Sequence, residues 1–392
     1  MARLAIPILL ALAGPALVPP SAGAQQQGKN LFLDLDSPLA GDVIREPLPL
    51  CEVRGWAGTG LRGKHDVVIV LDRSGSTFRS SGMDVDGDGV VGHDYATEMP
   101  EEIVTWTSDF GDTILSAEIQ AARRLIERLD PETTRMAIVS FGGNAELDAP
   151  LGSSREKLLA ALDKPPRPNA NGTYMYGAIE AALDAFNAAP AETGVRRQRE
   201  ILFLTDGVPT SPPDPPYAAQ LTAVQAARNA ARARARIYAY ALGPIAGVAL
   251  ENFQEIVKAN GGELLVLDSP GEIVEFVPYL SWTQIAKVEL TNTTNGQAGR
   301  AVRLFPDGSF DGFAPLTPGK NELKLTAISQ AGTRASLTRT ITYDKTAADP
   351  AKLEQFKKQL EVRAVETELY ERARAKREEA LKKQLEIKPE GR

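Results

Sequence analysis

The sequence is poor in the residue types on which several classes of protein depend. Its 392 residues include one cysteine and two histidines. A single thiol cannot form a disulfide within the chain, so stability must come from core burial, to which bound ions can add. Catalysis that needs a histidine base has only His65 and His93 to draw on. These shortages argue against a disulfide-stabilised fold and against most histidine-dependent enzymes.

The chain also lacks an excess of positive charge and, beyond its N-terminus, long apolar runs. The formal net charge is −7, whereas a surface for nucleic acid or anionic lipid would require a basic stripe. No later segment approaches the roughly 20 apolar residues that a membrane-spanning helix needs. We therefore expect no nucleic-acid partner and no transmembrane segment after removal of the leader.

The N-terminal residues have the pattern of an export signal. Arg3 precedes an apolar stretch over residues 4–18, and the small residues 22–24, Ala-Gly-Ala, lie where a signal peptidase would cleave. The alternative is an uncleaved membrane anchor, but prolines interrupt the stretch and it is too short to span a bilayer. We predict a signal peptide over residues 1–24 and an exported protein, either periplasmic or secreted to the cell surface.

Residues 62–282 alternate short apolar runs with amphipathic helical stretches. The runs are rich in Val, Ile and Leu without polar alternation, which is typical of parallel strands buried on both faces. Alternation of strand and helix predicts an α/β fold with a doubly wound, mostly parallel, Rossmann-like sheet. The expected strands are residues 67–71, 136–141, 201–205, 237–242 and 263–267, and the expected helices are residues 113–129, 174–187, 217–234, 250–259 and 271–282.

The segments on either side of this unit have the alternating pattern of antiparallel strands. Residues 285–344 contain about four or five such strands, fewer than the roughly seven of a β-sandwich. Residues 31–60 could supply the missing strands, and their sequence resembles that of the opening strands of bacterial immunoglobulin-like domains. We predict one immunoglobulin-like sandwich, interrupted by the α/β unit. The alternative is two independent small β regions.

Residues 350–392 differ from the rest of the chain. Lys, Arg and Glu dominate this segment, with leucines and other apolar residues spaced through it after Pro350. The pattern predicts one long charged helix. Its apolar stripe slips between heptad and helical registers, so two interpretations stay open. The helix either drives homo-oligomer formation or leans on its own protein.

Polar residues with oxygen ligands follow two of the expected strands and open one helix. Asp72, Ser74 and Ser76 come directly after the first strand, and Asp206 ends another. Thr173 stands at the start of an expected helix. Because the carboxyl ends of strands in such a sheet face one crevice, we expect these five side chains to converge there.

The five residues match, position for position, the metal-ion-dependent adhesion site (MIDAS) of the von Willebrand factor type A (VWA) family. Over residues 62–282 the chain resembles bacterial exported members of that family. The resemblance implies that the two serines and the threonine contact Mg²⁺, or Mn²⁺ in its place, while the aspartates act through water. It also implies a partner protein that donates an Asp or Glu carboxylate. Oxygen ligands of this kind suit a hard cation.

A second metal site is predicted within an insertion that covers about residues 78–111. Aspartates at loop positions 1, 3 and 5, glycine at 6 and an apolar residue at 8 match the spacing of a calcium loop over residues 84–95. Position 12, where a bidentate acid belongs, is Tyr95. The alternative is an acidic turn without a ligand. The expected calcium ligands are Asp84, Asp86, Asp88, Val90 and Asp94.

These patterns together predict an exported protein-binding or adhesion module that is not an enzyme. Its metal ion would accept a carboxylate from the partner. The alternative is a structural envelope scaffold that oligomerises through the C-terminal helix. A metal-assisted hydrolase is less favoured, because no histidine or other general base is evident beside the motif.

Overall fold

The computed structural model describes residues 31–59, 62–98, 103–163, 172–212, 218–243, 250–345 and 350–386. The expected signal peptide, residues 1–24, lies outside these ranges. Within the described residues, no helix combines the length and the apolar character that a membrane crossing needs.

A six-stranded sheet forms the centre of the α/β unit, in the order β11-β10-β9-β4-β7-β8. Neighbouring strands are parallel, except that β8 runs antiparallel to β7. The central strands are buried on both faces, as their unbroken apolar runs require. The strands are β4 (Lys64–Asp72), β7 (Thr134–Phe141), β8 (Ala145–Ala149), β9 (Arg197–Thr205), β10 (Ala235–Leu242) and β11 (Glu263–Leu267).

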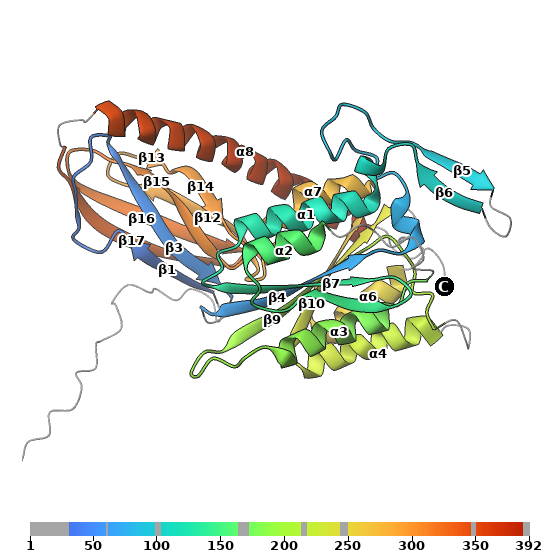
Figure 1. Ribbon diagram of the computed structural model, residues 1–392. Coiled ribbons are helices and arrows are strands. Elements are labelled where there is room, and N and C mark those ends of the chain that lie inside the picture. Colours follow the sequence, from blue (N-terminus) through green and yellow to red (C-terminus); the bar gives the residue numbers. More distant parts are fainter. Residues whose placement is uncertain are drawn as a thin grey trace, which may run out of the picture.

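Helices cover both faces of this sheet, and each face has its own hydrophobic cluster (Figure 1). The α/β fold class is therefore confirmed.

The structure also contains elements that the sequence pattern did not predict, namely α2 and the edge strand β8. The helix expected over residues 271–282 is broken into short 3-10 and α turns. One face carries α1 (Ile114–Arg128), α2 (Arg155–Leu162), η3 (Pro270–Glu272), α7 (Ile273–Phe276) and η4 (Val277–Tyr279), and the other carries α3 (Met175–Ala188), α4 (Ala218–Arg232) and α6 (Leu250–Asn260).

Two further sheets combine strands from both ends of the chain. One has the order β1-β3-β15-β14 and the other β13-β12-β16-β17-β2, and side chains from both sheets share one hydrophobic cluster. Such pairing is what one sandwich interrupted by the α/β unit would produce, and that interpretation stays our proposal. The strands are β1 (Phe32–Ser37), β2 (Val43–Ile44), β3 (Leu50–Gly58), β12 (Ile285–Asn292), β13 (Gln297–Ala298), β14 (Arg300–Leu304), β15 (Ser309–Pro315), β16 (Gly319–Ser329) and β17 (Arg334–Tyr343).

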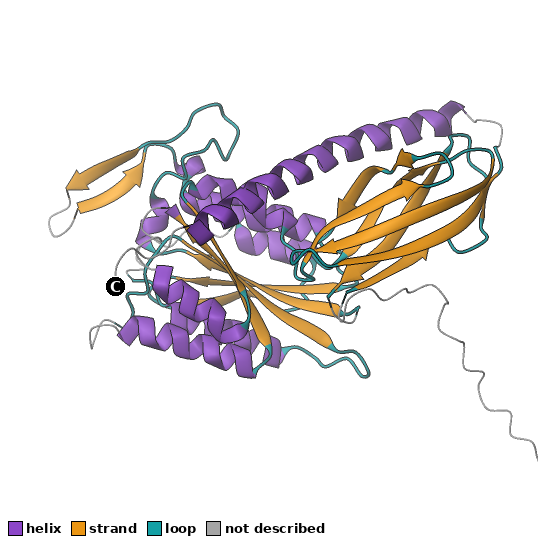
Figure 2. Cartoon of the chain, turned by 180° about the vertical axis from the view of Figure 1, so that it is seen from behind, coloured by secondary structure: helices purple, strands orange, loops and turns teal. Residues whose placement is uncertain are grey.

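The C-terminal helix α8 (Pro350–Glu386) lies along the sandwich and reaches the α/β unit (Figure 2). It packs against β14, β11 and α7. The ring of Tyr370 lies 5.3 Å from that of Tyr279, and Lys376 Nζ lies 2.9 Å from a carboxylate oxygen of Glu275. The helix thus contacts its own protein in both units.

The insertion after β4 forms a hairpin that projects from one end of the α/β unit (Figure 1). Its strands β5 (Asp94–Glu98) and β6 (Ile103–Thr107) pair antiparallel. The short turns η1 (Gly75–Phe78) and η2 (Phe110–Asp112) connect it to β4 and α1. The insertion therefore begins immediately after the residues predicted to bind metal.

Candidate metal-binding site

The carboxyl ends of β4 and β9 bring three of the predicted site residues into hydrogen-bonding distance. The two strands are adjacent and parallel, so the turns that follow them share one edge of the sheet. Ser76 Oγ donates a hydrogen bond to Asp206 Oδ1 at 2.8 Å. Ser74 Oγ and Ser76 Oγ are 3.1 Å apart. The hydroxyl groups of one turn therefore meet the carboxylate of the other.

Thr173 reaches the same place from the segment before α3. Its backbone N donates to Thr210 Oγ1 at 2.8 Å, and Thr210 N donates back to the carbonyl oxygen of Thr173 at 3.2 Å. A methyl group at Gly207 would lie 3.4 Å from Thr173 Oγ1 and 3.7 Å from Ser76 Oγ. The hydroxyl of Thr173 thus lies beside the turn that carries Asp206.

Asp72 forms hydrogen bonds through both carboxylate oxygens and through its backbone N–H. Its Oδ1 accepts a hydrogen bond from Ser74 N at 2.8 Å, and its Oδ2 accepts one from Thr205 Oγ1 at 2.5 Å. Its backbone N donates to Glu118 Oε2 on α1 at 2.9 Å. Because each of these partners is itself buried, the orientation of Asp72 is set before any ligand arrives.

The site concentrates negative charge in the protein interior. Asp72, Asp206 and Glu118 are 0, 2 and 0% exposed. Burial raises the pKa of Asp72. Burial, together with the charge of Asp72, raises the pKa of Asp206 to about 7. Burial and the charges of both aspartates raise the pKa of Glu118 well above its usual value. Arg73 and Arg79 act in the opposite direction but are the smaller effects.

This charge and this set of oxygens fit a hard divalent cation. Three buried carboxylates are costly without compensation, and one Glu118 oxygen, Oε1, has no hydrogen-bond partner among the described residues. Hydroxyl and carboxylate oxygens are the ligands that Mg²⁺ and Mn²⁺ prefer. The residues present therefore suit a bound ion.

Residues 67–208, which include most of β4, all of β9 and the five candidate ligands, match the family of von Willebrand factor type A domains. The chain contains a VWA domain. We use this name for the α/β unit built on the six-stranded sheet. The family match covers residues 67–208, and the parallel sheet flanked by helices agrees with it.

Other comparisons gave weaker likenesses. No curated protein matches the chain. Among solved structures, the conserved hypothetical protein BatB from Bacteroides thetaiotaomicron is similar at 19% identity and TM-score 0.37, over 52% of this chain and 91% of that one. The pilus adhesin SpaC from Lactobacillus rhamnosus GG is similar at 11% identity and TM-score 0.40, over 81% and 48%. Manganese-loaded TRAP protein of Plasmodium vivax is similar at 13% identity and TM-score 0.37, over 76% and 99%.

The calcium-like loop lies in the insertion of the VWA domain. Carboxylate oxygens of Asp84, Asp86 and Asp88 all lie within 4.8 Å of one another, and the three residues are exposed. Asp94 is not part of this group, and its Oδ1 accepts a hydrogen bond from Ser80 N at 2.6 Å. Val90 is also exposed, and its backbone N donates to Asp88 Oδ1 at 2.8 Å. The described structure thus groups three of the five expected ligands.

The sequence interpretation missed three residues that position the site. Thr205 and Thr210 hold Asp72 and Thr173, and Glu118 accepts the backbone N–H of Asp72. Glu118 had a detectable signal, because it interrupts the apolar stripe of α1 with a charge. The two threonines had none, since a threonine near a strand end is ordinary.

Proposed function

We propose that this protein is an exported, metal-dependent protein-binding or adhesion module. One observation carries the proposal. Hydroxyl and carboxylate side chains from three separate segments meet at the carboxyl edge of the VWA sheet, where burial outweighs the nearby arginines and raises the pKa of the carboxyl groups. The residues that would hold Mg²⁺, or Mn²⁺, are Asp72, Ser74, Ser76, Thr173 and Asp206.

The bound ion would supply positive charge for a carboxylate of the partner. Three of the five residues are neutral hydroxyls, and with both aspartates acting through water the protein atoms in direct contact with the ion would carry no negative charge. A partner's Asp or Glu side chain could then replace a water ligand. The chain would in this way accept an acidic group despite its formal net charge of −7.

The projecting insertion is placed to contribute to the same binding face. We propose that Ca²⁺ held by the cluster of Asp84, Asp86 and Asp88 stiffens this loop. The loop is tied to the domain because Asp112, at the end of η2, accepts hydrogen bonds from Val85 N at 2.6 Å and Gly92 N at 3.0 Å. Long loops at strand ends commonly determine which ligand a domain accepts.

Binding fits the site better than hydrolysis. His65 is the second residue of β4, seven residues before Asp72, so the two lie about 23 Å apart along the strand. His93 lies in the insertion, with its Nδ1 2.9 Å from Ser108 Oγ. His65 is therefore too far along the strand to act as a general base at the proposed ion, and the ring of His93 is engaged by Ser108.

The proposal is tested by affinity capture of envelope proteins on the immobilised chain. The capture is run with Mg²⁺, with EDTA, and with Asp72→Ala. The matched control is Asp184→Ala, an exposed aspartate on α3. We expect a partner that is retained by the wild type and by Asp184→Ala in Mg²⁺, and lost in EDTA and with Asp72→Ala. A partner retained equally in all conditions would remove the metal-dependent mechanism.

A second proposal, a structural scaffold that oligomerises through α8, is favoured by one observation. Val362, Val365 and Leu369 form an apolar stripe on α8 that is 47–60% exposed. Sedimentation velocity at increasing concentration separates the two proposals. Self-association that is abolished by Val365→Glu and unaffected by EDTA would favour the scaffold.

A further inference from the structure

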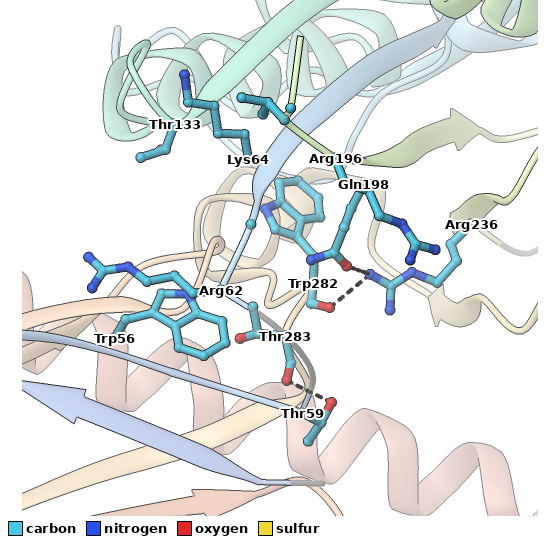
Figure 3. Close-up of a pocket in the computed structure, with 13 residues that line it drawn as sticks. Trp56, Thr59, Arg62, Lys64, Thr133, Arg196, Gln198, Arg236, Trp282 and Thr283 are labelled. Atoms are coloured by element: carbon cyan, nitrogen blue, oxygen red, sulfur yellow. Dashed lines mark hydrogen bonds between the residues drawn. The ribbon is translucent and has the colours of Figure 1, made fainter. Parts of the chain in front are cut away.

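A cavity of about 600 Å³ lies between the sandwich and the VWA domain, at the end of the sheet opposite the candidate metal site (Figure 3). Trp56 on β3 borders it from the sandwich, and Lys64 at the start of β4 borders it from the VWA domain. Both segments that cross between the two units also line it. Thr59 and Thr283 stand on these crossings, and Thr59 N donates to the carbonyl oxygen of Thr283 at 3.1 Å.

The charge of the lining is one-sided. Among the described residues that border the cavity, four carry a positive charge and none carries a negative charge. This contrasts with a formal net charge of −7 for the whole chain. The four cationic residues are Arg62, Lys64, Arg196 and Arg236.

Arg196 is the least satisfied of these four cations. It is exposed, and no ion pair of its guanidinium is found within the described part of the chain. Arg62, by contrast, contacts Asp36 at 2.6 and 2.7 Å, and Lys64 Nζ lies 3.3 Å from Glu192. An arginine has five N–H donors, so one carboxylate partner leaves donors free for a ligand.

Neutral hydrogen-bond donors also line the cavity. The indole N–H of Trp282 is buried without a hydrogen-bond partner among the described residues, and the side chain is 1% exposed. Figure 3 shows its ring among the side chains of Lys64, Gln198 and Arg236. Arg236 Nη2 donates to the carbonyl oxygen of Trp282 at 3.1 Å. A buried N–H without a partner is uncommon, because leaving it unpaired costs free energy.

We propose that this cavity binds a small anionic molecule that carries hydroxyl groups, such as an acidic sugar or a sugar phosphate. The cations would contact the anionic group, and Trp282, Gln198 and the threonines would contact the hydroxyl groups. The volume lies within the range of about 300–1,000 Å³ that is usual for small-ligand sites. Because both crossing segments line the cavity, the bound molecule joins the sandwich to the VWA domain and stabilises their junction.

The test uses the full chain at low ionic strength. Glucuronate, glucose 6-phosphate and inorganic phosphate are titrated by calorimetry and by tryptophan fluorescence, with glucose as the uncharged control. We expect at least one of the two sugar anions to bind and to raise the melting temperature, while glucose does neither. A preference for glucose 6-phosphate over glucuronate assigns the anionic group as a phosphate, and the reverse assigns it as a carboxylate.

The variant Arg196→Ala should weaken binding of that anion about tenfold, the effect of losing one charge-assisted contact. It should leave the fold unchanged, since Arg196 is exposed. The matched control is Arg334→Ala, an exposed arginine at the start of β17. The proposal is overturned if neither sugar anion binds, if glucose binds as tightly, or if Arg196→Ala binds like the wild type.

Discussion

Residues that would not contact the proposed ion still fix the orientation of its ligands. The clearest example is Asp72, whose two carboxylate oxygens accept hydrogen bonds from Ser74 N and Thr205 Oγ1. Partners of metal ligands commonly tune metal affinity by fixing orientation. The affinity of the site should therefore respond to Thr205 as well as to the five motif residues.

We expect Thr205→Val to weaken Mg²⁺ binding by about 10- to 100-fold, because the nearly isosteric change removes the hydrogen bond to Asp72 Oδ2. Calorimetric titration of Mg²⁺ measures the effect. Thr222→Val is the control, since Thr222 Oγ1 bonds only a carbonyl of its own helix α4. Equal affinity in Thr205→Val and the wild type would show that Asp72 needs no such support. Circular dichroism checks that both variants fold.

Cys51 offers a prediction on pH dependence. Burial in β3, assisted by the charge of Asp42, raises the pKa of its thiol to about 12. The thiol should therefore resist iodoacetamide at pH 8.5 and react only after unfolding in urea. The folded-state pKa exceeds the ordinary value of 9.0, so the unfolded chain loses its proton first. Stability should fall as pH rises from about 9 towards 12, and Cys51→Ala should reduce this loss.

At the scale of elements, the insertion carries the predicted calcium site and directly follows the serines of the predicted magnesium site. Its acidic loop begins six residues after η1 ends, and backbone N–H groups of Gly87 and Gly89 donate to Asp84 at 2.7 and 3.0 Å. These hydrogen bonds within the loop, together with those from Val85 N and Gly92 N to Asp112, bend it so that its three aspartates lie close together. Such a cluster repels itself until a cation binds.

Calcium should therefore raise the melting temperature of the wild type, and the double variant Asp84→Ala/Asp88→Ala should lose this shift. The removed carboxylates are exposed and hydrogen-bond only within the loop, so the metal-free double variant should still fold. Differential scanning fluorimetry with and without Ca²⁺ measures the shift, and Asp184→Ala is the control. An undiminished shift in the double variant would place calcium elsewhere.

For the helix α8, the sequence pattern predicts the helix but does not decide what the helix packs against. Its charged sequence was compatible with self-association and with packing on its own protein. In the structure Tyr370 and Ala373 are buried against the protein itself, and Arg377 pairs with Glu263 on β11. Nothing in the local spacing of α8 specifies those partners, because they lie on other elements far along the chain.

At the scale of the whole molecule, the VWA domain has hydrophobic clusters of its own on both faces of its sheet. We therefore expect residues 62–282, expressed alone, to unfold cooperatively in urea, and Mg²⁺ to raise the melting temperature of this fragment as it does that of the full chain. The two crossings lie side by side, since Thr59 and Thr283 are hydrogen-bonded. A fragment that stays unfolded while the full chain folds would contradict our interpretation of an inserted domain.

The sequence by itself determined the α/β class, because buried parallel strands and amphipathic helices leave a local periodicity that can be read without coordinates. It also placed Asp72, Thr173 and Asp206 at strand ends or a helix start. Only the tertiary structure decided which distant elements meet. Trp56 Nε1 donates to the carbonyl oxygen of Asp307 across 251 residues, and the cationic cavity forms where both crossings pass. Such contacts depend on how whole elements pack. The sequence around one contacting residue therefore does not reveal which distant residue it will meet.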